Sequence, residues 1–197
     1  MKIEIYPVHA YLEQSRSFMY STIDRGAGDV QDFEKLSGTF FFALLSQAYI
    51  YAFMAIQSFL SEQLWITWNA SDKPLQNKFP QAKTFEHLMN SDLKKINDQI
   101  NILSDILGIP QIHSSDGELW NDFLKVVKLT RDFLIHPSPE PEKVDKIVGH
   151  VYSKRDWSYP SEVASKILLH FMQHTKSQIP DWVSHNTLIR VTNIKAL

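Results

Sequence analysis

The sequence LSGTFFFALLSQAYIYAFMAIQSFLS, residues 36–61, contains no charged side chain. Its length and lack of charge are compatible with a membrane-spanning helix. When the segment is wound as an α-helix, however, its polar residues fall near one stripe; these are Thr39, Ser46, Gln47, Gln57 and Ser58. A helix that faces lipid has no need for such a stripe. We therefore expect a long central helix that is buried on most sides, in a protein that does not span a membrane.

The next part of the chain, residues 84–108, repeats apolar side chains at helical spacing. They are Phe85, Leu88, Met89, Leu93, Ile96, Ile100, Leu103 and Leu107. Polar residues interrupt the pattern, and we expect Ser91 or Asp92 to act as the N-cap of a second helix. Gly108 then ends this helix, because glycine readily adopts the left-handed conformation that terminates helices.

Two further segments, residues 114–136 and 161–178, also have helical periodicity, and Ser161 is a candidate N-cap for the last helix. Residues 10–22 form a shorter candidate helix near the N-terminus. No segment shows the sustained alternation that is typical of a strand. The pattern predicts an all-α fold, an up-and-down helical bundle of roughly five to seven helices.

The chain has 197 residues, which fits a single helical domain over residues 1–197. It contains no cysteine, which excludes disulfides, thiolate metal sites and cysteine nucleophiles and is compatible with a reducing compartment. The first residues lack the apolar core of a secretion signal, so we expect a cytoplasmic protein. The formal net charge of −2 does not favour broad binding of nucleic acid, although a local basic patch is compatible with it.

The sequence RDFLIHP, residues 131–137, places an arginine, a histidine and a proline at the end of an apolar helix. In a regular helix Arg131 and His136 would point about 140° apart. They can converge only if the helix ends at His136, and Pro137 favours such an ending because it excludes its predecessor from the α conformation. The carbonyl end of the helix also favours the charged form of His136. These residues are therefore candidates for proton transfer and for phosphate recognition.

The segment WNDFLKVVKLTRDFLIHP, residues 120–137, resembles the signature helix of the HEPN superfamily. Members of that superfamily carry an arginine, usually a polar residue next, and then a histidine after four to six residues; Arg131, Asp132 and His136 fit this pattern. The long uncharged segment resembles the family's early helix. The resemblance covers residues 38–178 and leaves the two ends of the chain as embellishments. It implies a HEPN-like fold.

The resemblance also implies a metal-independent endoribonuclease of the toxin or antiphage type, with RNA as substrate and an antitoxin as a possible partner. His136 would assist attack of the RNA 2′-OH on the adjacent phosphate, Arg131 would stabilise the transition state, and Asp132 would orient them. Two copies would form a homodimer with a composite site. Lys125 and Lys128 lie on the same helix and are candidate RNA-binding residues. Ser138 stands where some members carry a tyrosine that a partner enzyme modifies, which argues against that form of control.

Two other interpretations remain open at the level of sequence. Arg131 and His136 can be structural, with the arginine paired to a buried carboxylate or capping carbonyls and the histidine bonded to a backbone oxygen at the helix end. The chain can also be a noncatalytic HEPN-like module that binds a nucleotide or a protein. His170 and His174 have a spacing that suits zinc, but no third ligand is evident from the sequence, so we expect neither a metal nor another cofactor.

Overall fold

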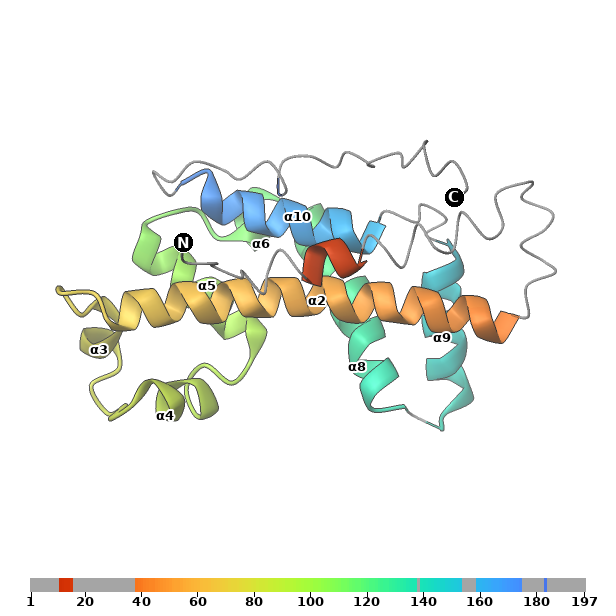
Figure 1. Cartoon of the computed structure of the whole chain (residues 1–197), viewed down its shortest axis with the longest axis horizontal. Helices are drawn as coiled ribbons and strands as arrows, with labels where there is room; N and C mark the ends of the chain where they lie inside the picture. The colour runs from red at the N-terminus through yellow and green to blue at the C-terminus, as the bar shows by residue number, and fades with distance from the viewer. Residues whose placement is uncertain (1–10, 16–37, 138, 154–158, 175–182, 184–197) are drawn as a thin grey trace, which may run out of the picture.

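The computed structural model of the chain describes residues 11–15, 38–137, 139–153, 159–174 and 183 (Figure 1). Helices make up 78% of the residues that can be interpreted, and none of these residues lies in a strand, so the expected all-α class is confirmed. Of the candidate helix at residues 10–22, residues 11–15 are helical, and the others lie outside the described residues.

The elements that follow residues 11–15 are, in chain order, α2 (Gly38–Trp68), α3 (Pro74–Lys78), α4 (Phe85–Asn90), α5 (Ile96–Leu107), α6 (Ile112–Ser115), α7 (Gly117–Asn121), the π-helix η2 (Asp122–Lys128), α8 (Leu129–Ile135), α9 (Pro141–Ser153) and α10 (Tyr159–Met172). In Figure 1, α2 extends along the long axis of the molecule and α10 lies along one side of it. α3, α4 and α8 lie toward the opposite side.

Helix α2 organises the core, because α10, α5, α8 and α3 all contact it. Its inner face contributes the buried side chains Ala48, Tyr49, Ala52, Phe53, Ala55, Ile56, Phe59, Leu60, Leu64 and Trp68. Of the polar residues that the sequence places on one stripe, Gln47 and Gln57 are exposed and Ser46 and Ser58 are half-buried, while the side chain of Thr39 lies outside the description. Across the part of the chain that the structure describes, no helix is long and apolar enough to cross a membrane.

The turn between α4 and α5 corrects one expectation from the sequence. α5 begins at Ile96 and its N-cap is Lys95, which makes no side-chain capping bond, so neither Ser91 nor Asp92 caps it. Ser91 instead closes α4, where its hydroxyl donates to the carbonyl oxygen of His87 at 2.7 Å. The expectation for the other end of α5 is confirmed, because Gly108 ends it with a φ of +66°.

The last described helix, α10, also starts earlier than the sequence indicates. It begins at Tyr159, so Ser161 is not its N-cap but lies inside the first turn, where it is buried. Pro160 is compatible with this position because the first turn of a helix does not need its N–H. α10 then packs on α2, and the rings of Phe59 and Phe171 lie 5.9 Å apart between their centroids.

Candidate functional site

The candidate site lies at the end of a helix that we call the site helix, residues 117–135, which comprises α7, η2 and α8. Asp116 begins it as an N-cap, with its carboxylate accepting a hydrogen bond from the Leu119 N–H at 2.9 Å. Its inner side buries Leu119, Phe123, Val126, Val127 and Thr130. Five apolar residues follow helical spacing along it, and of these Phe123 and Val127 are buried, while Trp120, Leu124 and Leu134 are half-buried against the core.

The site helix ends where the sequence predicts. Its last helical residue is Ile135, and His136 follows as the C-cap with φ −127° and ψ 73°, outside the helical region. The backbone N–H of His136 still donates to the carbonyl oxygen of Asp132 at 2.9 Å. The His136 side chain is exposed, so the histidine is accessible to a ligand from solvent.

Arg131 lies against α2 rather than extending into solvent. Its guanidinium carbon is 4.6 Å from the centroid of the Phe53 ring, a distance at which a cation is attracted to the face of an aromatic ring. Phe53 in turn stacks on Phe123, with the ring centroids 6.2 Å apart. The Arg131 side chain keeps 26% of its surface exposed. The arginine is therefore held in a fixed orientation while part of it remains open to a ligand.

Asp132 links two cations on the outer side of α8. It accepts hydrogen bonds from Lys128 Nζ at 2.6 Å and from Arg131 Nη1 at 2.9 Å. Partial burial alone would raise the pKa of Asp132, but these hydrogen bonds and the two positive charges outweigh burial and hold the pKa below its ordinary value. Asp132 is therefore ionised at neutral pH and fixes the arginine and the lysine beside each other.

The structure thus brings together Lys128, Arg131 and Asp132 but not His136. It contains no hydrogen bond between Arg131 and His136, although they lie at the same end of one helix. Lys125 is exposed on η2 and forms no ion pair with a described residue. One carboxylate and three cationic side chains leave this end of the site helix locally positive, in a chain of net charge −2.

The structural interpretation of the arginine matches the structure only in part, because the carboxylate that pairs with Arg131 is 36% exposed and not buried. Arg131 does pair with a carboxylate, that of Asp132, and its Nε is buried without a hydrogen-bond partner among the described residues. For His136 that interpretation fails within the described part of the chain, because the exposed ring has no backbone oxygen as a partner there.

A polar cluster beside the site helix has no clear signal in the sequence. Burial and then the nearby Asp122 carboxylate raise the pKa of Tyr159. The same two causes, burial first, raise the pKa of Tyr49 on α2. Both phenols therefore stay protonated at neutral pH. Asp122 is the first residue of η2, so the cluster lies where the site helix changes from α to π winding.

The two histidines with zinc-like spacing have other contacts. His170 Nε2 lies 2.9 Å from the carbonyl oxygen of Pro110, and the rings of His170 and His174 are 5.8 Å apart between centroids. Burial is the main cause that lowers the pKa of His170. Among the residues with described positions, no group of three or more His, Cys, Asp or Glu side chains is arranged to hold a metal ion.

Comparison with known proteins gives no match: the chain resembles no family profile, no curated protein and no solved structure at a significant level. The assignment of a function therefore depends on the residues of the site helix and on their geometry.

Proposed function

We propose that this protein is a metal-independent endoribonuclease of the HEPN type, with a composite site formed by two copies of the chain. The observation that carries the proposal is the end of the site helix: Arg131 lies one turn before an exposed His136 that is already outside the helix. In an ideal helix the side chains of Arg131 and His136 would point about 140° apart. Because the helix ends before His136, this constraint no longer applies to the histidine. Both residues can then reach one phosphate.

The proposed reaction needs a base, an acid and a stabiliser of negative charge. His136 of one copy removes the proton from the RNA 2′-OH, and the resulting oxygen attacks the adjacent phosphorus. Arg131 stabilises the charge that develops on the phosphoryl oxygens, because its donors are already oriented by Phe53 and Asp132. The bond to the 5′ oxygen breaks, and that oxygen takes a proton from His136 of the second copy. The products are a 2′,3′-cyclic phosphate end and a 5′-hydroxyl end.

The lysines support the proposal through charge. Lys128 is neutralised in part by Asp132, whereas Lys125 has no ion-pair partner among the described residues. Both follow one another along η2 toward Arg131, so an RNA backbone that reaches Arg131 would pass near them. A role as a toxin or an antiphage effector, with an antitoxin as a partner, belongs to the same proposal and rests on the resemblance alone.

The test is cleavage of total RNA and transfer RNA in the presence of EDTA. The wild-type protein should cleave and leave cyclic phosphate ends, while His136→Ala and Arg131→Ala should lose activity and keep their circular dichroism spectra. His87→Ala is the matched control, because His87 is exposed on α4 and lies outside the site helix. Equal activity in all four proteins would place the cleavage elsewhere or in a contaminant.

A noncatalytic binding module is the second candidate. It is favoured by the sequestration of the Arg131 Nε and by two large apolar side chains, Trp65 and Ile66, that are 52% and 55% exposed at the end of α2. If the wild type is as inactive as His136→Ala under all ionic conditions while it still binds RNA or a nucleotide, this function replaces the endoribonuclease.

A further inference from the structure

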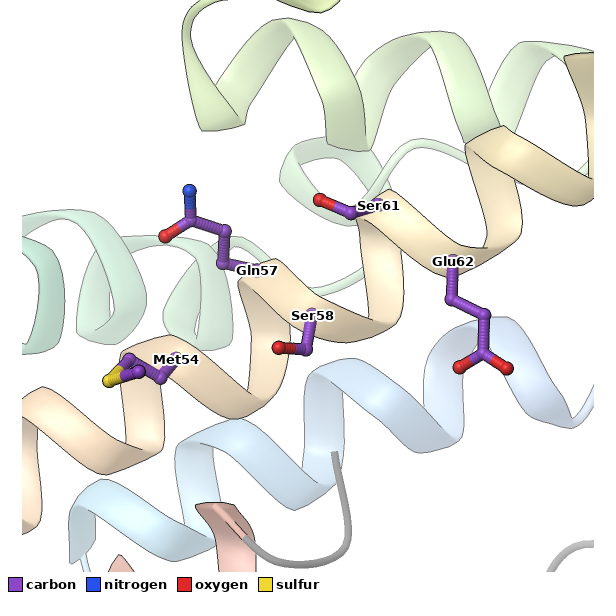
Figure 2. A pocket seen from close by; sticks show the side chains of 5 residues that line it. All are labelled: Met54, Gln57, Ser58, Ser61 and Glu62. Carbon is purple, nitrogen blue, oxygen red and sulfur yellow. The ribbon is translucent and has the colours of Figure 1, made fainter. Parts of the chain in front are cut away.

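The outer side of α2 contains a row of side chains that the described helices cover only in part. Met54, Gln57, Ser58, Ser61 and Glu62 line a shallow hollow of about 440 Å³ (Figure 2). Gln57 is exposed and the other four are half-buried. Trp65 and Ile66 continue the row and are more than half exposed. The Trp65 ring also packs edge-on against Phe85 of α4, with the ring centroids 5.2 Å apart. We call these seven residues the α2 stripe.

The α2 stripe is unusual in its charge. Glu62 is the only charged residue among the 31 residues of α2. A helix at the surface of a protein normally carries charged residues on its outer face, and a helix without them is normally covered. Figure 2 shows Gln57 directed to one side of the helix and Glu62 to the other, which leaves the small side chains of Ser58 and Ser61 between them.

Apart from a basic side chain opposite Glu62, the cover must itself be nearly uncharged, because any other charge buried against this stripe would lose its hydration without a partner. The outer faces of the other long described helices do not meet this condition. α5 exposes Asp98 and Asp105, and α10 exposes Lys166. α9 exposes four charged side chains, Glu142, Lys143, Asp145 and Lys146. Across the described part of the chain, the long helix that offers a matching face is α2 itself.

We propose that the α2 stripe is the contact surface between two copies of this chain, which pack with their α2 helices antiparallel about a two-fold axis near Ser58. Ser58 lies at the middle of the hollow, and Ser58 and Ser61 allow two helix backbones to approach closely, since interhelical distance depends on side-chain size at the contact. An isologous contact of this kind is the commonest form of protein dimer.

Charge selects the antiparallel direction. A parallel pair would place the two Glu62 carboxylates side by side, which is unfavourable. In the antiparallel pair Glu62 of each copy faces Met54 of the other, and the two carboxylates lie about 12 Å apart along the axis. Figure 2 shows the Glu62 carboxylate directed to the side of the helix, away from Gln57.

This arrangement specifies the face through which the composite site would form, and only that functional meaning depends on the proposed function. Arg131 lies over Phe53, which is the residue immediately before the stripe begins at Met54. The stripe therefore begins one residue from the contact that holds Arg131, and in the antiparallel pair the two Phe53 positions lie about 15 Å apart along the axis. The existence of the contact itself stands on the shape and charge of α2.

The natural absence of cysteine gives a direct test. Near a two-fold axis a single engineered cysteine meets its own copy, and a disulfide needs the two Cα atoms within about 7 Å. Ser58→Cys should form a covalent dimer on mild oxidation. Trp65→Cys should not, because in the antiparallel pair its copies are about 21 Å apart along the axis. Ser114→Cys, at an exposed position on α6, is the control for random collision.

A second variant tests the contact without a covalent bond. Ser61→Arg should weaken the dimer at least about tenfold in sedimentation velocity, because it buries an unpaired charge, while Ser114→Arg should not weaken it.

A monomeric wild type, a dimer that tolerates Ser61→Arg, or equal cross-linking at positions 58 and 65 would overturn the proposal. A dimer that depends on the stripe but cleaves no RNA would refute the endoribonuclease and leave this contact standing. Cleavage of RNA by a protein that stays monomeric would refute this contact and leave the endoribonuclease activity standing without a composite site.

Discussion

Helix α2 and the site helix pack against each other, with Phe53 on Phe123 and on Arg131, but they differ in nearly every other respect. α2 is a single regular helix of 31 residues with one charged side chain. The site helix is built from segments of five, seven and seven residues and carries six charged side chains. The rings of Phe53 and Phe123 join them. The two helices therefore differ in role. α2 contributes buried side chains to the core and a contact surface, while the site helix places charged groups at its end.

The largest expected effect comes from removing the aromatic contact between the two helices. Phe123 has no exposed surface and touches both Phe53 and Trp120, so Phe123→Ala should reduce the free energy of unfolding by about 3–5 kcal/mol. Urea denaturation followed by circular dichroism measures this loss. Asn121→Ala, at an exposed position on the same helix, should change the stability by no more than about 0.5 kcal/mol. A loss below about 1 kcal/mol for Phe123→Ala would mean that the two helices do not depend on this contact.

The next effect concerns the start of the site helix, which, unlike α4 with Thr84, is capped by a carboxylate. Asp116→Ala removes the acceptor for the Leu119 N–H and should lower the stability by about 1 kcal/mol. Asp116→Asn keeps an acceptor oxygen and should recover most of that loss. Thermal unfolding of the three proteins at one pH distinguishes these outcomes. If asparagine is as harmful as alanine, charge rather than the capping bond is responsible.

The charged end of the site helix should make stability depend on pH, a property that α2 with its single charge cannot supply. The pKa of Asp132 is lower in the folded protein than in the unfolded chain, where it is about 3.9. Its contribution is therefore present above pH 4 and is lost as the pH falls through the folded-state pKa. The carboxylate is 36% exposed, so water screens it and the contribution should stay below about 1 kcal/mol.

The measurement is a comparison of the wild type with Asp132→Asn in urea at neutral pH and at acid pH. The variant should be the less stable protein at pH 7, and the difference should shrink in acid. A difference that is equal at both values would show that the asparagine acts through packing and not through ionisation.

The smallest expected effect on stability is at Lys125. This side chain is exposed and forms no ion pair with a described residue, so Lys125→Ala should change the free energy of unfolding by less than about 0.5 kcal/mol. If RNA passes along η2, the same change should reduce the salt dependence of RNA binding by about one unit in the logarithmic slope. Lys94→Ala, exposed between α4 and α5, should leave that slope unchanged. Equal slopes in the two variants would remove Lys125 from the RNA path.

The sequence predicts those features that depend on local pattern. The uncharged segment identifies α2, Gly108 identifies the end of α5, and Pro137 with His136 identifies the end of the site helix. The N-cap expectations at Ser91 and Ser161 are wrong, because a capping residue type is common within loops and first turns as well. The exposure of His136 and the pairing of Arg131 with Asp132 are not predicted from the sequence and are seen only in the structure.

Other features of the site depend on tertiary contacts that no local pattern encodes. Phe53, which holds the Arg131 guanidinium, is 78 positions away in the chain. The cluster of Asp122 with Tyr49 and Tyr159 joins three distant segments. The π winding of η2 has no signature in the apolar spacing, because Phe123, Val126 and Val127 also fit an ordinary helix. HEPN membership and activity remain predictions.

The π-helix has a consequence for how this chain tolerates changes in length. A turn closed by i→i+5 bonds accommodates more residues than an α-helical turn, so η2 behaves as an α-helix that has absorbed additional sequence. Loss of one residue there can be taken up by a return to α winding, because fewer residues then complete the same rotation about the helix axis. Arg131 would keep its place over Phe53. Within residues 122–128, the winding of the helix can therefore compensate for a change of one residue in length.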